Sequence, residues 1–305
     1  MFRSLIRTIT PNPLDALLKK AQKNDTKRVL ICWNRGLGDI ALGLYAIILR
    51  IKTFLPKSTI TFLIRKDLAD GFTMLKGVDV LIAKNWRRAC SYDIEGALQE
   101  NQFTRKDFDL VIEKPDPTYW VKWQLGKIVP KLSWDKNHDK KHEKFKLDAK
   151  ILVGIQVAVE TKYGLWRNWP LENYQKLFET FQDNPYVKFL LFGQQSDLSF
   201  PYSNLIDLRG KTTLFELLSI IKNRCDMVIL PDSGILTLTY FLNEQFDLDV
   251  ISFWGDPRHG ILKQNVISPN KRLHHYPLIG KNKDLSTVKP DQVIELVNNL
   301  CMKKS

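Results

Sequence analysis

Short apolar runs that alternate with helical segments constrain the fold of this chain more than any other feature of its sequence. Residues 28–33 (RVLICW) form such a run, and a glycine-containing turn and an apolar helical segment at 39–54 follow it. An uninterrupted apolar run of this length indicates a strand that is buried on both faces. Strands that alternate with helices predict parallel βαβ units, so the sequence indicates an α/β fold.

The alternation occurs twice, which fits two domains in a chain of 305 residues. In the first half we expect strands at residues 28–33, 59–64, 78–82 and 108–112. In the second half we expect strands at 151–155, 186–192, 226–230 and 250–254, and helices at 171–181, 213–221, 235–241 and 290–302. Ligands bind outside the carboxyl ends of the strands in open α/β sheets. If two such domains face each other, they form a cleft, and the strand ends of each domain would bind one of two substrates.

Shifts in composition predict the domain boundaries. Residues 131–150 contain seven lysines and four acidic residues with almost no apolar pattern, which indicates a solvated linker. The expected organisation is a basic amphipathic segment at 1–27, a first domain at 28–130, the linker at 131–150, a second domain at 151–289 and a C-terminal helix at 290–305.

The N-terminal segment has an amphipathic pattern, with Phe2, Leu5, Ile6 and Ile9 on one helical face. A short basic amphipathic helix can lie on an anionic membrane. It can also pack on the protein's own surface, and this second interpretation is favoured because so short a helix is marginal alone.

Composition excludes several classes of protein. The formal net charge of +13 favours anionic partners, but no nucleic-acid-binding motif is visible, so nucleic acid is not expected as a partner. The four cysteines lie far apart without a CxxC pair, which argues against a disulfide scaffold or a thiolate zinc site. No apolar run reaches the length of a membrane span and no signal peptide is evident, so we expect a cytoplasmic protein.

The first candidate site is the turn 35–39 (RGLGD), directly after the first predicted strand. Gly36, Gly38 and Ala41 fit a dinucleotide fingerprint, and Arg65 stands where a 2′-phosphate of NADP would lie. Asp39, however, would repel a pyrophosphate at the start of the helix. Its carboxylate makes better sense as a general base, although a simple helix cap is an equally ordinary use of aspartate.

Two further candidate sites follow strands of the second half. The segment 161–170 contains Thr161, Lys162 and Arg167, which are suited to binding phosphate, while Trp169 is interpreted as a packing residue. Asp232, Ser233 and Gly234 form a strand–turn–helix junction that could hold a phosphate, or could be an ordinary N-cap.

Other strand ends and the histidines give weaker signals. Gly193 and Gly255 each end a predicted strand and are expected to line the cleft. The five histidines show no metal-ligand spacing, and His274 and His275 are interpreted as a surface pair. No Walker loop or nucleophile elbow is present.

Taken together, these motifs resemble those of the bacterial lipopolysaccharide heptosyltransferase family, glycosyltransferase family nine. The resemblance rests on five motifs in family order over residues 28–260: 36–40 (GLGDI), 167–170 (RNWP), 207–214 (DLRGKTTL), 232–234 (DSG) and 253–255 (FWG). It implies a GT-B fold with two Rossmann-like domains, the first for the acceptor and the second for the donor. It also implies an inverting, metal-independent transfer of a sugar, typically from ADP-heptose, with no cofactor.

The resemblance also implies roles for particular residues and partners. Asp39 matches the proposed general base, Arg167 the residue that holds the donor phosphates, and Asp232–Gly234 the donor-binding loop. The implied acceptor is an anionic glycolipid at the cytoplasmic face of the inner membrane, where the protein would make peripheral contact.

The sequence departs from the family pattern at three positions. Thr237 replaces a histidine near the donor, and Leu42 and Tyr45 stand where the helix after Asp39 usually has histidine and proline. A degenerate, non-catalytic sugar-nucleotide binder therefore remains an alternative, as does an NADP-dependent oxidoreductase that uses the Gly36–Gly38 turn.

Overall fold

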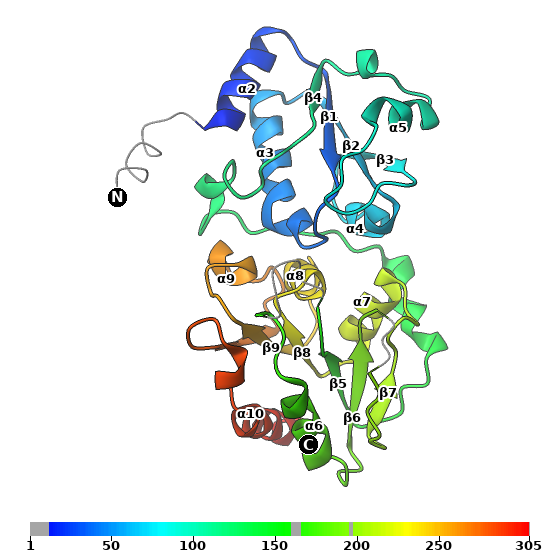
Figure 1. Cartoon of the computed structure of the whole chain (residues 1–305), viewed down its shortest axis with the longest axis vertical. Coiled ribbons are helices and arrows are strands. Elements are labelled where there is room, and N and C mark those ends of the chain that lie inside the picture. Colours follow the sequence, from blue (N-terminus) through cyan, green and yellow to red (C-terminus); the bar gives the residue numbers. More distant parts are fainter. Residues whose placement is uncertain (1–11, 160–165, 195–197, 305) are drawn as a thin grey trace. The chain divides into compact units, whose positions relative to one another are not determined.

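The computed structural model describes residues 12–159, 166–194 and 198–304. The chain divides into two compact units, with the division between Pro130 and Lys131. Each unit contains one parallel β-sheet with helices around it (Figure 1). This is the α/β architecture that the alternating apolar runs predict.

Unit 1 has a four-stranded parallel sheet in the order β3-β2-β1-β4. The strands are β1 (Arg28–Trp33), β2 (Thr59–Arg65), β3 (Asp79–Ala83) and β4 (Leu110–Ile112). The helices are α2 (Pro13–Lys23), α3 (Tyr45–Phe54), α4 (Ala69–Phe72) and α5 (Ile94–Glu100), and a π-helical turn, Ile40–Leu44, leads into α3. The central strands β1 and β2 are buried almost throughout, as their unbroken apolar sequence requires.

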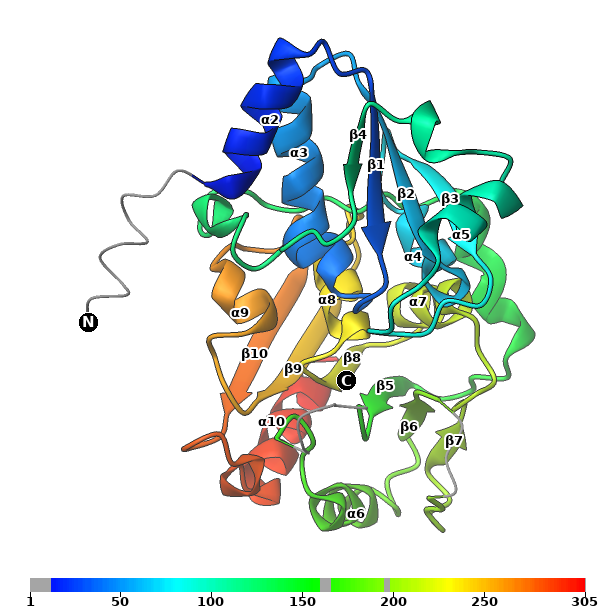
Figure 2. The same ribbon diagram turned by 45° about the horizontal axis from the view of Figure 1, so that its top comes forward.

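Unit 2 has a six-stranded parallel sheet in the order β10-β9-β8-β5-β6-β7, and Figure 2 shows β10 at one edge and β7 at the other. The strands are β5 (Ile151–Gln156), β6 (Val187–Phe192), β7 (Leu205–Asp207), β8 (Met227–Pro231), β9 (Leu248–Trp254) and β10 (Leu273–Ile279). The helices are α6 (Leu171–Thr180), α7 (Leu214–Asn223), α8 (Gly234–Phe241), α9 (Gly260–Gln264) and α10 (Pro290–Met302).

Local sequence signals explain where several of these elements begin. Thr213 and Glu216 form the capping box expected at the start of α7, because each side chain bonds the other residue's backbone N–H. Pro290 occupies the first turn of α10, where the missing N–H costs nothing. Trp169 is buried and stacks on Phe253, which confirms its interpretation as a packing residue.

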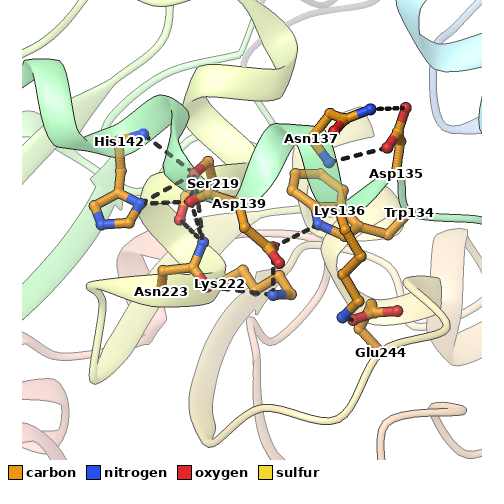
Figure 3. Close-up of polar contacts among 10 residues, drawn as sticks. All are labelled: Trp134, Asp135, Lys136, Asn137, Asp139, His142, Ser219, Lys222, Asn223 and Glu244. Carbon is orange, nitrogen blue, oxygen red and sulfur yellow. Dashed lines mark hydrogen bonds and ion pairs between the residues drawn. The ribbon is translucent and has the colours of Figure 1, made fainter.

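The charged segment 131–150 differs from the solvated linker that its lysines predict. It belongs to unit 2, and a 3-10 helical stretch, Lys136–Lys144, packs against α7. Figure 3 shows Asp139 at the centre of this contact, where its carboxylate accepts hydrogen bonds from Lys222 and Trp134, each 2.7 Å long. Its backbone carbonyl accepts a further bond of 2.8 Å from the Ser219 hydroxyl. The segment docks through polar groups, which an apolar-periodicity argument does not detect.

The structure describes the N-terminal segment from residue 12 onward. Its second half forms α2, which buries Leu14 and Leu18 against the unit, and the Asp15 carboxylate binds both Nε and Nη2 of Arg50 on α3. The predicted apolar face of Phe2, Leu5, Ile6 and Ile9 lies outside the described residues. Among the described residues, no helix has the length and hydropathy of a membrane span.

Candidate functional site

Asp39 lies between the end of β1 and the π-helical turn, at the carboxyl end of the unit 1 sheet. Its Oδ2 atom accepts a hydrogen bond of 3.1 Å from the backbone N–H of Gly36, three residues earlier. At the helix start, its side chain makes no capping bond with the following N–H groups. The carboxylate therefore closes the glycine turn in front of the helix, which differs from the alternative of a simple helix cap.

The glycine turn is shaped to bring backbone and carboxylate together. A Cβ atom at Gly36 would lie 3.1 Å from Asp39 Oδ2, so the absence of a side chain leaves room for the carboxylate. The carbonyl of Gly38 accepts bonds from the N–H groups of Ala41 and Leu42 and so begins the helical turn. The structure thus brings three predicted site residues, Gly36, Gly38 and Asp39, into one turn.

The same geometry argues against a dinucleotide at this turn. The Gly36 N–H, which a pyrophosphate would need, already donates to Asp39. Arg65 is buried, and its guanidinium binds both carboxylate oxygens of Asp67 and the carbonyls of Asn34 and Arg35. A side chain held in this way is not available for the 2′-phosphate of NADP.

Sequence reasoning missed a group of exposed cations beside this turn. Arg35 extends from the end of β1, and Arg87 and Arg88 extend from the loop after β3. The two loops are joined because the Asn34 side-chain amide donates to the Cys90 carbonyl over 2.8 Å. The signal was present in the sequence as an Arg-Arg pair after a predicted strand.

In unit 2, the structure brings Arg167 and Asp232 together. Arg167 Nε is 3.4 Å from Asp232 Oδ2, and one third of the arginine side chain is exposed while the aspartate is buried. Burial raises the pKa of Asp232, and electrostatic interaction with the nearby Arg167 and His259 opposes this rise. The site therefore has a partly accessible guanidinium that a buried carboxylate orients.

The loop that carries Arg167 is fixed at its end. The Asn168 side chain exchanges two hydrogen bonds with the backbone of Val159, of 2.9 and 3.2 Å. Thr161 and Lys162, which were predicted to bind phosphate, lie outside the described residues.

Ser233, Gly234 and Thr237 start α8 at the carboxyl end of β8. The Ser233 hydroxyl accepts a bond from the N–H of Leu236, which is an ordinary N-cap and supports the second of the two interpretations for this residue. Thr237 is buried, and its hydroxyl donates to the carbonyl of Ser233 over 3.0 Å. The Thr237 proton is thus directed toward its own helix, so a role in donor binding stays a prediction.

Two glycines allow close packing at the ends of β8 and β9. A Cβ at Gly255 would lie 2.3 Å from the Trp166 carbonyl oxygen, and one at Gly260 would lie 2.5 Å from Asp232 Oδ1. Gly260 also has a φ of +48°, which favours glycine. Gly255 therefore belongs to this site, and Gly260 is an addition that sequence reasoning missed.

Further charged groups surround the Gly255 end of this site. Asp256 is buried, and Arg258, His259 and Lys283 all lie within ion-pair distance of its carboxylate. Hydrogen bonds from the Arg258 side chain and backbone lower the pKa of Asp256. The His259 ring also contacts Trp166, with 5.3 Å between the ring centroids. The site thus has an excess of positive groups at the carboxyl ends of β8 and β9.

Gly193 and the paired histidines lie away from this group of contacts. Gly193 ends β6 with a φ of +129° and accepts a bond from the N–H of Gly210. The prediction of a surface pair is wrong for His275, because its Nε2 lies 2.6 Å from Ser252 Oγ and burial lowers its pKa to about 4. His274 is exposed, as expected.

Within residues 12–159, 166–194 and 198–304, no group of three or more His, Cys, Asp or Glu side chains is arranged to hold a metal ion.

Comparison with solved structures relates the fold to known enzymes. The ADP-heptose lipopolysaccharide heptosyltransferase II of E. coli aligns over 91% of this chain and 99% of its own, with a TM-score of 0.63 and 14% identity. A family 9 glycosyl transferase from Veillonella parvula aligns over 91% and 98%, with a TM-score of 0.59 and 18% identity. The chain has the GT-B fold of the heptosyltransferases.

A third solved structure also aligns with most of this chain. The iron-containing dodecameric glycosyltransferase TibC from enterotoxigenic E. coli aligns over 92% of this chain and 77% of its own, with a TM-score of 0.56 and 12% identity. No protein-family model matches the sequence, and no curated protein matches it. At these identities the likeness shows the GT-B fold alone.

Proposed function

We propose that this protein is a glycosyltransferase that moves a heptose from ADP-heptose to an anionic glycan acceptor. The observation that carries the proposal is the pair of sites at the carboxyl ends of the two sheets. Unit 1 presents Asp39 beside exposed arginines, and unit 2 presents Arg167 beside Asp232. The Asp39 carboxylate can take a proton from an acceptor hydroxyl, and the Arg167 guanidinium can bind a diphosphate.

The proposed reaction is a single displacement at the anomeric carbon of the donor. Asp39 takes the proton of the acceptor hydroxyl as its oxygen forms the new bond to that carbon. The bond between the anomeric carbon and the diphosphate oxygen breaks, and its electron pair leaves with ADP. Arg167 and the N-terminus of α8 stabilise the negative charge on the leaving diphosphate. One displacement inverts the anomeric configuration, and the proposed reaction needs no metal, so activity should persist in EDTA.

The acceptor is proposed to be an anionic glycolipid of the lipopolysaccharide core. The exposed side chains of Arg35, Arg87 and Arg88 lie on the two joined loops next to Asp39. Guanidinium groups bind phosphate and carboxylate strongly, and often through two parallel hydrogen bonds. We propose peripheral contact with the membrane that carries such an acceptor, at the cytoplasmic face.

A binding screen distinguishes this proposal from its rivals. Thermal unfolding would be followed with ADP-heptose, other nucleotide sugars, ADP and NADPH, because a ligand that binds only the folded state raises Tm. We expect ADP-heptose and ADP to raise Tm, and Arg167→Met to abolish the shift. Stabilisation by NADPH alone would favour the oxidoreductase. Stabilisation by ADP-heptose without transfer to any glycolipid acceptor would favour a non-catalytic binder.

A further inference from the structure

The turn that follows Asp39 has an unusual hydrogen-bond register. The N–H of Tyr45 donates to the carbonyl of Ile40, five residues earlier, so residues 40–44 form a π turn rather than an α turn. The extra residue in the π turn changes the direction in which the chain enters α3. The position of Asp39, which immediately precedes the π turn, relative to α3 thus depends on whatever holds this turn.

Two contacts from the segment that follows β4 reach this turn. A Cβ at Gly43 would lie 2.3 Å from Pro117 Cβ and 2.9 Å from its carbonyl oxygen, so Pro117 packs directly on the glycine. One residue earlier in the turn, the Leu42 carbonyl accepts a hydrogen bond of 3.1 Å from the side-chain amide of Gln124. Figure 1 shows the chain after β4 passing the lower end of α3, where this turn lies.

Gln124 is completely buried, so it acts on this turn and not on a ligand. Among the described residues its Oε1 atom has no hydrogen-bond partner. A buried acceptor without a partner costs free energy, so an apolar side chain of the same length would remove an unfavourable group together with the bond to Leu42. Replacing Gln124 by such a side chain should change the free energy of unfolding little, but it removes the hydrogen bond to the Leu42 carbonyl in the π turn.

We propose that Gln124 is a positioning residue that, with Pro117, holds the π turn and thereby fixes the carboxylate of Asp39. The inference rests on the proposed function, in which Asp39 is the base. It assigns to the segment after β4 a part in catalysis that none of the sequence motifs indicates.

The test compares Gln124→Met with Asn101→Leu. Asn101 is a matched control because its amide also donates to backbone carbonyls of unit 1, but to those of Ile82 in β3 and Ala97 in α5 rather than to the π turn. We expect Gln124→Met to lower kcat by about 10- to 100-fold, the scale of a small misplacement of a catalytic group, with KM for the donor unchanged. Asn101→Leu should leave kcat within about twofold of wild type if positioning, not general stability, is responsible.

A second readout does not depend on transfer. The Gly36 N–H donates to Asp39, so its hydrogen exchange reports where the carboxylate lies. Exchange at Gly36 should accelerate in Gln124→Met and in Gly43→Ala, which pushes against Pro117, and should be unchanged in Asn101→Leu. Unchanged exchange at Gly36 in both turn variants would overturn the inference. If both turn variants show accelerated exchange at Gly36 but the wild-type protein transfers no sugar, the positioning of Asp39 by Gln124 is supported and the proposed function is rejected.

Discussion

Asp39 and Asp232 are both aspartates at the carboxyl end of a parallel strand, yet their surroundings differ. Asp39 is half-buried, and its Oδ2 accepts a hydrogen bond from the backbone N–H of Gly36. Asp232 is buried beside a single guanidinium, at 3.4 Å from Nε. The first is suited to accept a proton from a bound hydroxyl, whereas the second is suited to orient Arg167.

The raised pKa of Asp232 predicts that this residue reduces stability at neutral pH. The folded state holds the proton of Asp232 more tightly than the unfolded state does, because burial raises the pKa. The folding free energy therefore becomes less favourable as pH rises through the interval between the unfolded and the folded pKa. Asp232→Asn should raise Tm at pH 7 by a few degrees, since about 1 kcal/mol corresponds to roughly 2–4 °C in a domain of this size.

Thermal unfolding of both proteins between pH 7 and pH 3 checks this sign. The advantage of Asp232→Asn should shrink as pH falls and wild-type Asp232 becomes protonated. The same variant should bind ADP-heptose more weakly, because Arg167 loses the charge that orients it. A variant that is less stable than wild type at pH 7 would show that the ion pair outweighs the effect of burial.

At the scale of elements, apolar runs predicted eight strands and alternating segments predicted the helices between them. β7 and β10 were missed for physical reasons. β7 has only three residues, and β10 is an edge strand with alternating exposure that contains His274, His275 and Pro277. Edge strands bury less apolar surface, so the pattern that identifies the central strands is weak there.

Composition alone placed the segment Lys136–Lys144 in solvent, whereas the structure packs it against α7. The importance of this contact for stability can be tested at Asp139. Burial opposes the charge on Asp139, but the bonds from Lys222 and Trp134 outweigh it and lower the pKa of this carboxyl group. Asp139→Ala would leave the half-buried ammonium of Lys222 without this acceptor. We expect the unfolding free energy of unit 2 to fall by about 1–3 kcal/mol.

Chemical denaturation measures this loss, and hydrogen exchange in residues 136–144 localises it. Asp148→Ala is the control, because Asp148 lies on the same charged stretch and is exposed. An equal, small effect of the two substitutions would mean that the contacts around Asp139 do not hold the segment on α7.

At the scale of the whole molecule, the docking of this segment shortens the connection between the two units. The Gln124 side chain donates to the π turn before α3 in unit 1, and the N–H of Leu132 donates to the carbonyl of Phe241 in unit 2. The connection therefore consists of a few residues around Gly126, which has a φ of +71°, and Pro130. The sequence indicated a linker of 20 residues because lysines are usually solvated and the polar docking contacts have no periodic signature.

The candidate sites could be predicted in part because they follow strand ends. Glycine turns and strand ends predicted Asp39, Arg167, Asp232 and Gly255, all of which the structure places at carboxyl ends of the sheets. Gly260, His259 and Gln124 could not be found in this way. Their roles depend on contacts between segments far apart in the sequence, such as the bond from Gln124 to Leu42.

Sugar transfer by the purified protein tests the central claim most directly. Wild type, Asp39→Asn and the exposed control Asp70→Asn would be incubated with ADP-heptose and a phosphorylated lipopolysaccharide-core acceptor, and the glycosylated product measured by mass spectrometry. We predict that wild type and Asp70→Asn transfer sugar at similar rates. The rate of Asp39→Asn should be lower by a factor of about 100 or more, the usual scale for a general base. Equal rates in all three proteins would remove Asp39 from the mechanism, and no product from wild type, despite binding of the donor, would contradict the assignment as a glycosyltransferase.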